Sequence, residues 1–320
     1  MTKLITTAFA LTLVSACADV SGGSDRGPTQ PVTPPPDEQT ETAVPEQIAG
    51  NLRSVDYQPD GDEARITLLY LDSGEVLQQY TRQTDFDVVG GGTVFDGRAV
   101  TGTSEFRAFT HQEGPNGRFV TVLVARSDDD AVQATVATDG GRLGYFFGGA
   151  DYRQLTAYVA PESGLATYTG TYVGLINIKI RDDYVNVDTG LPEIAQSGRS
   201  SRTVGDVILY ADFADNAVEG LIFNRAVEND AYELRDVVLR NTTVDANGSF
   251  VGEAQQRNPD PEVPGLQTIG VYGGVFGGNQ ASAVAGGMNI GGFDPDRTAL
   301  TETGIFVLNC GVAEPTCRTP

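Results

Sequence analysis

The sequence contains few of the residues on which most catalytic and metal sites depend. Its 320 residues include one histidine, three cysteines, two methionines and no tryptophan. General acid–base and nucleophilic catalysis rely most often on histidine, so a Ser-His-Asp triad would have to use His111. This residue lies just before a Gly/Pro turn, where a solvated loop histidine is expected. One chemical role stays open for it, axial ligation of haem iron, which needs a single imidazole and an apolar pocket.

Positive charge is scarce as well. The chain has 21 lysines and arginines against 43 aspartates and glutamates, which gives a formal net charge of -22, and its only lysines are Lys3 and Lys179. Nucleic acids and anionic lipid surfaces are bound by clustered lysine and arginine side chains. The composition therefore excludes nucleic acid as a partner and direct electrostatic docking onto anionic lipid. It favours basic partners or cations.

The N-terminus has the three parts of a bacterial lipoprotein signal. Lys3 is followed by an apolar run over residues 4–14 and by a small-residue cleavage site before Cys17. We expect residues 1–16 to be a signal peptide and Cys17 to carry acyl chains such as palmitate, which anchor the chain to a membrane. The alternatives are an ordinary signal peptide or a short membrane anchor, although the run is shorter than the about 20 residues that a spanning helix needs. With alanine directly after the cysteine, the chain resembles outer-membrane lipoproteins. Its orientation, toward the periplasm or the cell surface, stays open.

Residues 17–47 have the composition of a tether. They are rich in proline, glycine, threonine and acidic residues and nearly free of large apolar side chains. Such a segment cannot bury a hydrophobic core. We expect an extended, disordered link between the lipid anchor and the folded part.

The remainder of the chain has the composition of an all-β protein, with β-branched and aromatic residues and 39 glycines. In residues 48–160, short runs with strand character are separated by turn signals, and we expect them to form hairpins in a sandwich-like sheet. A connection to a second unit is expected over residues 151–164. The expected strands span residues 65–71, 76–82, 93–95, 104–110, 119–125, 131–137 and 143–147.

Residues 161–310 begin with the clearest pattern of the chain. Even positions from 168 to 180 are apolar or glycine and most odd positions are polar, which predicts one long, half-buried strand. Seven further runs follow, and eight antiparallel strands can close into a barrel. The seven runs span residues 203–213, 217–225, 234–243, 249–254, 267–277, 281–290 and 301–309.

Two cysteines lie near the C-terminus, Cys310 and, in the tail of residues 311–320, Cys317. In an oxidising compartment, two cysteines this close in sequence are expected to form a disulfide that closes a small loop. A metal site is the alternative, but two cysteines without a nearby histidine make a poor zinc site.

Two segments of the second unit carry a family resemblance. They are residues 166–174, ATYTGTYVG, and residues 273–287, GGVFGGNQASAVAGG, with residues 304–307 as a closing strand. Over about residues 150–310 the chain resembles the β-barrel domain of bacterial transferrin-binding protein B and related surface lipoproteins. The resemblance implies a β-rich handle domain over residues 48–160, followed by an eight-stranded antiparallel β-barrel over residues 161–310. The motif residues with a structural role are Gly170, Tyr172, Gly174, Gly274, Phe276, Gly277 and Gly286.

The resemblance also implies a function. Members of this family bind host proteins such as transferrin, and some relatives bind haemoglobin or haem. Because their partner contacts lie in variable loops, no ligand-binding residue is carried over to this chain. We therefore expect a monomeric outer-membrane or surface lipoprotein that binds a protein or an iron-bearing ligand and is not an enzyme.

Two other functions remain open. One is a structural or assembly role in the cell envelope, with the sheet as a docking surface. The other is a dimeric aspartic protease, since Asp188-Thr189-Gly190 has the short signature of enzymes in which two carboxylates share a proton. A turn after the long strand explains this triplet equally well, because a match of three residues is weak.

Overall fold

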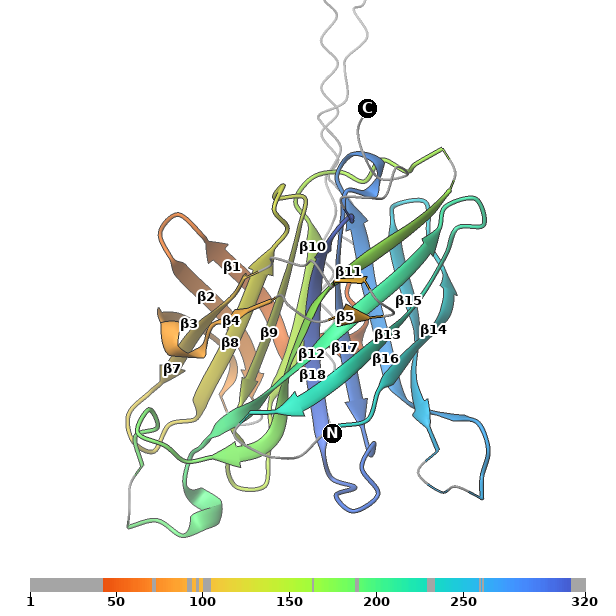
Figure 1. Cartoon of the computed structure of the whole chain (residues 1–320). Coiled ribbons are helices and arrows are strands. Elements are labelled where there is room, and N and C mark those ends of the chain that lie inside the picture. Colours follow the sequence, from red (N-terminus) through yellow and green to blue (C-terminus); the bar gives the residue numbers. More distant parts are fainter. Residues whose placement is uncertain are drawn as a thin grey trace, which may run out of the picture. The chain divides into compact units, whose positions relative to one another are not determined.

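The described part of the chain is almost entirely strand and turn (Figure 1). The computed structural model describes residues 43–70, 73–90, 94–95, 98–99, 105–162, 164–187, 190–228, 234–258, 260 and 262–311. Helical residues in these ranges are confined to α1 (Glu46–Ala49) and three short 3-10 turns, η1 (Thr84–Phe86), η2 (Glu193–Ala195) and η3 (Asn279–Ala281). No helix in this part of the chain has the length and hydrophobicity needed to cross a membrane. The predicted signal peptide and Cys17 lie outside the described residues.

The first half of the described chain forms an antiparallel sheet, which corresponds to the predicted handle. Its strand order is β1-β2-β3-β7-β8-β9-β10, and β4 pairs with β7 at the side of this path. A separate hairpin joins β5 to β6. The strands are β1 (Leu52–Gln58), β2 (Glu63–Tyr70), β3 (Gly74–Arg82), β4 (Val88–Val89), β5 (Val94–Phe95), β6 (Arg98–Ala99), β7 (Glu105–Gln112), β8 (Phe119–Arg126), β9 (Val132–Asp139) and β10 (Gly148–Gln154).

The last strand of this sheet lies later in the chain than its sequence pattern predicts. The prediction of a strand over residues 143–147 is wrong, because Leu143 and Gly144 have φ angles of 55° and 79°, which an extended strand does not adopt. These residues form a turn, and β10 begins at Gly148, partly within the segment expected to be a connection. The pattern also does not predict β1.

The second half closes into a barrel of eight strands, as the sequence predicts. The barrel runs in chain order from β11 to β18, and β11 pairs with β18 to complete the ring, with Tyr172 opposite Phe306. All of the pairings are antiparallel, so the predicted fold class is confirmed (Figure 1). The strands are β11 (Leu165–Ile180), β12 (Arg199–Asp212), β13 (Ala217–Val227), β14 (Val237–Thr243), β15 (Ser249–Arg257), β16 (Leu266–Gly277), β17 (Ala283–Gly291) and β18 (Thr301–Asn309).

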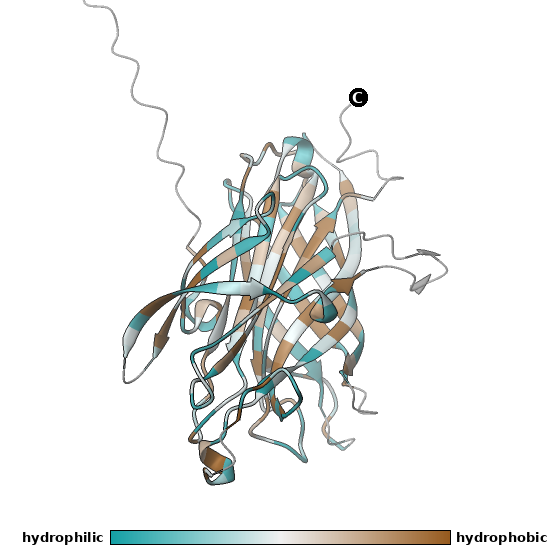
Figure 2. Cartoon of the chain, turned by 90° about the vertical axis from the view of Figure 1, so that its left-hand side faces the viewer, coloured by the Kyte–Doolittle hydropathy of each residue, from teal (hydrophilic) through white to brown (hydrophobic). Residues whose placement is uncertain are grey.

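The barrel interior is filled by side chains. Hydrophobic and hydrophilic residues alternate along its strands (Figure 2), and the inward residues form one core cluster. Phe276 lies at the centre of an aromatic group, with ring centroids 5.4 Å from Tyr168, 5.5 Å from Phe213 and 5.4 Å from Phe250. These rings occupy the space that a hollow barrel would offer to a ligand.

A second core lies between the sheet and the barrel. Val136 of β9, Val275 of β16 and Val307 of β18 are all fully buried in it. Val173 and Leu175 of β11 also belong to this core, so β11 is buried on both faces along its middle. The prediction of a half-buried strand is therefore wrong in this stretch, because the first sheet covers the outer face of the barrel there.

Candidate binding groove on the barrel

A buried polar network lies inside the barrel around Glu302, the second residue of β18. Arg225 donates to Glu302 Oε2 at 2.5 Å, and both side chains are completely buried. Tyr172 and Thr203 donate their hydroxyl hydrogens to Glu302 Oε1 at 2.6 and 2.8 Å. Burial and the Glu302 charge raise the pKa of Tyr172 well above its usual value, so its hydroxyl stays protonated and remains a donor. The guanidinium of Arg225 also donates to the Arg235 carbonyl at 2.7 Å, and these contacts make the network an element of the barrel core.

The motif glycines make room for this network and for the aromatic rings. A Cβ at Gly174 would collide with the Thr203 hydroxyl and lie 2.8 Å from the Tyr172 hydroxyl. At Gly274 and Gly286 a Cβ would collide with the rings of Phe250 and Phe306, respectively. Their lack of a side chain thus permits tight packing.

The other motif positions also lie in packed surroundings. Gly277 faces β9, where a Cβ would lie 2.6 Å from Val132 Cγ1. Gly170 is buried on β11, opposite Val207, and Phe276 is fully buried. In this structure the motif residues shape the barrel and its junction with the sheet.

The remaining predicted site residues do not come together. His111 lies on β7, half-buried, with its ring 5.6 Å from that of Tyr80, so the prediction of a solvated loop histidine is wrong. Cys310 follows β18, and its amide donates to the Ser282 carbonyl at 2.8 Å. Cys317, Asp188 and Thr189 lie outside the described residues, so the disulfide and the protease triplet stay predictions. Within the described ranges, no group of three histidine, cysteine or carboxylate side chains is placed to hold a metal ion.

A charged clamp joins the sheet to the barrel. The Phe86 ring of η1 is stacked by the guanidinium groups of Arg199 and Arg202, at 4.7 and 5.3 Å from its centroid. Both arginines bind Glu228, with N···O distances of 3.0 Å for Arg199 and 2.7 Å for Arg202. Burial alone would raise the pKa of Glu228, but hydrogen bonds from Arg202 and Arg199 outweigh it and lower the pKa to about 2. Arg199 also binds Asp182 at 2.5 Å.

The clamp should make the stability of the protein sensitive to acid. A carboxyl whose folded-state pKa lies below its unfolded value stabilises the fold at neutral pH, and this contribution is lost as the pH falls from about 4.5 to about 2. We measure the free energy of unfolding by urea titration at pH values from about 5 to about 2. Over this range we expect it to fall by up to about 3 kcal/mol more in the wild type than in Glu228→Gln. Glu162→Gln, at an exposed position, is the control and should keep the wild-type pH dependence. Equal acid sensitivity in Glu228→Gln and the wild type would contradict the assignment.

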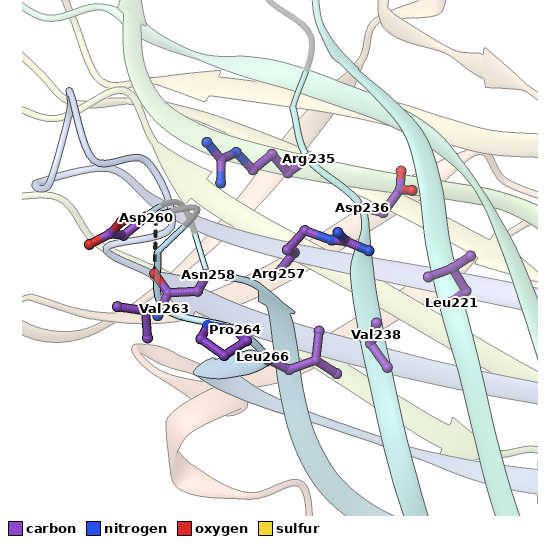
Figure 3. Close-up of a pocket in the computed structure, with 11 residues that line it drawn as sticks. Leu221, Arg235, Asp236, Val238, Arg257, Asn258, Asp260, Val263, Pro264 and Leu266 are labelled. Carbon is purple, nitrogen blue, oxygen red and sulfur yellow. Dashed lines mark hydrogen bonds between the residues drawn. The ribbon is translucent and has the colours of Figure 1, made fainter.

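A groove with a volume of about 970 Å³ lies on the outer surface of the barrel (Figure 3). It crosses four neighbouring strands, from β13 to β16, and is bordered by the loop that joins β15 to β16. Apolar side chains of Leu221, Val238 and Leu266 line it. It is also lined by Arg235, Asp236, Arg257, Asn258, Asp260, Val263, Pro264 and Gly265.

The groove lies beside the barrel seam for which the fewest ladder pairs are seen, between β14 and β15. Strands β14 and β15 are paired only at Val238↔Gln255 and Leu239↔Ala254. Away from the groove, the hydroxyl of Tyr272 on β16 donates to the Arg240 carbonyl of β14 at 2.5 Å, and the Thr242 hydroxyl of β14 donates to the Val251 carbonyl of β15 at 2.6 Å. Side chains therefore help to hold together the end of this seam that lies away from the groove.

Comparison with solved structures finds similarity to transferrin-binding protein B structures. Among solved structures, the chain is similar to intact Ap transferrin-binding protein B with its N and C lobes, at 13% identity and a TM-score of 0.35, over 80% of this chain and 54% of that one. It is also similar to a double mutant of transferrin-binding protein B from Haemophilus parasuis Hp5, at 14% identity and a TM-score of 0.37, over 81% of this chain and 54% of that one. For transferrin-binding protein B of serogroup B Neisseria meningitidis, the identity is 14% and the TM-score 0.34, over 80% of this chain and 50% of that one. The chain resembles transferrin-binding protein B. It spans about half the length of these proteins. No family model and no curated protein matches.

The groove residues carry no signal that the sequence could have revealed. Arg235 and Arg257 are 22 positions apart and belong to no recognisable motif. Their proximity depends on the antiparallel register of β14 and β15, which is a property of the closed barrel and not of either strand alone.

Proposed function

We propose that the protein is a non-catalytic lipoprotein of the outer membrane or cell surface that binds a protein or iron-bearing ligand as a monomer. Acyl chains on Cys17 hold it to the membrane, and residues 17–47 link this anchor to the folded part. Residues 48–160 form the handle and residues 161–310 the barrel. The ligand meets the outer surface of the barrel and its loops.

One observation carries the binding role: a large groove with mixed polar and apolar walls lies outside a barrel whose interior is filled. Binding sites are concave and combine apolar walls with a few polar groups, and the groove fits this description. The interior does not, because the aromatic group around Phe276 and the network around Glu302 occupy it. The transferrin-binding proteins are named for a protein ligand, which accords with a protein partner here.

A capture experiment tests this function. The full-length chain, purified in detergent with a C-terminal tag, is incubated with envelope extract and with growth medium, and haem absorbance is recorded on the same sample. We expect one partner to be retained saturably by the wild type. Leu266→Glu, in the groove, should abolish retention, whereas Leu77→Glu should not. The Leu77 side chain is also exposed, 65% against 45% for Leu266, but it lies on β3 of the first sheet.

Two results would contradict the proposal. Recovery of clean protein with neither a partner nor a haem signal would favour a structural role in the envelope. Equal loss of a partner in both leucine variants would show that retention does not depend on the groove.

A further inference from the structure

The groove contains positive charge that the described chain leaves unpaired. The guanidinium groups of Arg235 and Arg257, and of Arg240 on the same strand pair, are exposed and form no ion pair or hydrogen bond with described residues. Ten other arginines in the described ranges each lie within 4.0 Å of a carboxylate. In a chain of net charge -22, Arg240 on β14, Arg257 on β15 and Arg235 just before β14 form a local site for a negative group.

Apolar surface lies directly beside these charges. Figure 3 shows the Arg257 side chain between Asp236 and the apolar side chains of Val238 and Leu266. Val263, in the loop between β15 and β16, also lines the groove, and its side chain is 48% exposed. A ligand that fits this surface needs both a negative group for the guanidinium and an apolar part for the walls.

The length of the groove suits an extended ligand. Its lining residues come from four neighbouring strands, from β13 to β16, and adjacent strands of a sheet lie about 4.8 Å apart.

The two aspartates of the groove restrict the kind of anion. Asp236 is exposed, and Asp260 accepts a hydrogen bond from the Glu262 amide at 2.9 Å. Their charges repel a polyanion with closely spaced phosphates, whereas single carboxylates can meet Arg235 or Arg257 separately through charge-assisted hydrogen bonds. We propose that the groove binds an extended peptide segment of a partner protein that carries both acidic and apolar side chains. This inference deepens the proposed function and rests on it.

Fluorescence polarisation with the full-length chain in detergent tests the inference. The probe is a labelled peptide of about eight residues, ~26 Å when extended, that combines valine and threonine with two glutamates. A second probe has lysines in place of the glutamates. We expect the wild type to bind the glutamate peptide, and Arg257→Gln to weaken this binding by about tenfold. Arg181→Gln, at an exposed arginine that likewise has no ion pair with a described residue but lies just after β11, should leave the affinity unchanged.

Three outcomes would overturn the inference: no binding of the glutamate peptide, equal binding of the lysine peptide, or an unchanged affinity in Arg257→Gln. They are distinguishable from failure of the proposed function. If Leu266→Glu abolishes capture of the natural partner while Arg257→Gln leaves it intact, the groove binds a partner of different chemistry and the binding function stands.

Discussion

Arg225→Met should lower the free energy of unfolding by about 3–5 kcal/mol, because it leaves the Glu302 carboxylate unpaired inside the barrel. Both side chains are completely buried, and Arg225 is the cation that binds Glu302 Oε2. The variant also removes the hydrogen bond at 2.7 Å from Arg225 to the Arg235 carbonyl. Urea denaturation followed by circular dichroism measures the loss.

Two further variants separate the charge from the loss of packing. Glu302→Gln in the Arg225→Met background removes the buried charge but keeps an acceptor for Tyr172 and Thr203, so it should recover part of the lost stability. Arg240→Met, at an exposed arginine, should change stability by no more than about 0.5 kcal/mol. A loss in Arg225→Met as small as that of Arg240→Met would show that the buried pair contributes little.

Phe276→Ala is expected to lower the free energy of unfolding by about 3–5 kcal/mol, because it leaves a cavity among the aromatic rings that fill the barrel. The Phe276 ring contacts those of Tyr158, Tyr168, Phe213 and Phe250. Phe276→Leu keeps most of the volume and should cost less than about 1.5 kcal/mol. Equilibrium denaturation of both variants checks the difference, and similar losses in the two would place the centre of the core elsewhere.

The barrel was predictable because its signal is local and repeated. In β11 the alternation of residues 168–180 identifies the inward side chains Tyr168, Tyr172 and Ile176, all of which are buried in the barrel core. The burial of Val173 on the other face was not predictable, since it depends on a sheet formed by a distant part of the chain. Alternation thus identifies a strand and its inward face, but it does not show what covers the outer face.

The strand wrongly predicted over residues 143–147 shows a second limit of prediction from local sequence. Residues 143–147, LGYFF, have the aromatic content of a strand, yet positive φ angles at Gly141, Leu143 and Gly144 turn the chain there. Strand β10 begins with two glycines and contains few apolar residues, and it forms because it pairs with β9 and packs on the barrel. Tertiary contacts outweigh local propensity at this position. The groove could not be predicted for a related reason, since it depends on the register of neighbouring barrel strands.

The second core has a consequence for how the chain folds and unfolds. Val136 comes from one half of the sequence and Val275 and Val307 from the other, so neither half can complete this layer alone. A barrel stripped of the sheet would expose an apolar wall along β17 and β18, and large exposed apolar patches promote aggregation. The two halves should therefore melt together, and neither is expected to be stable as a separate fragment.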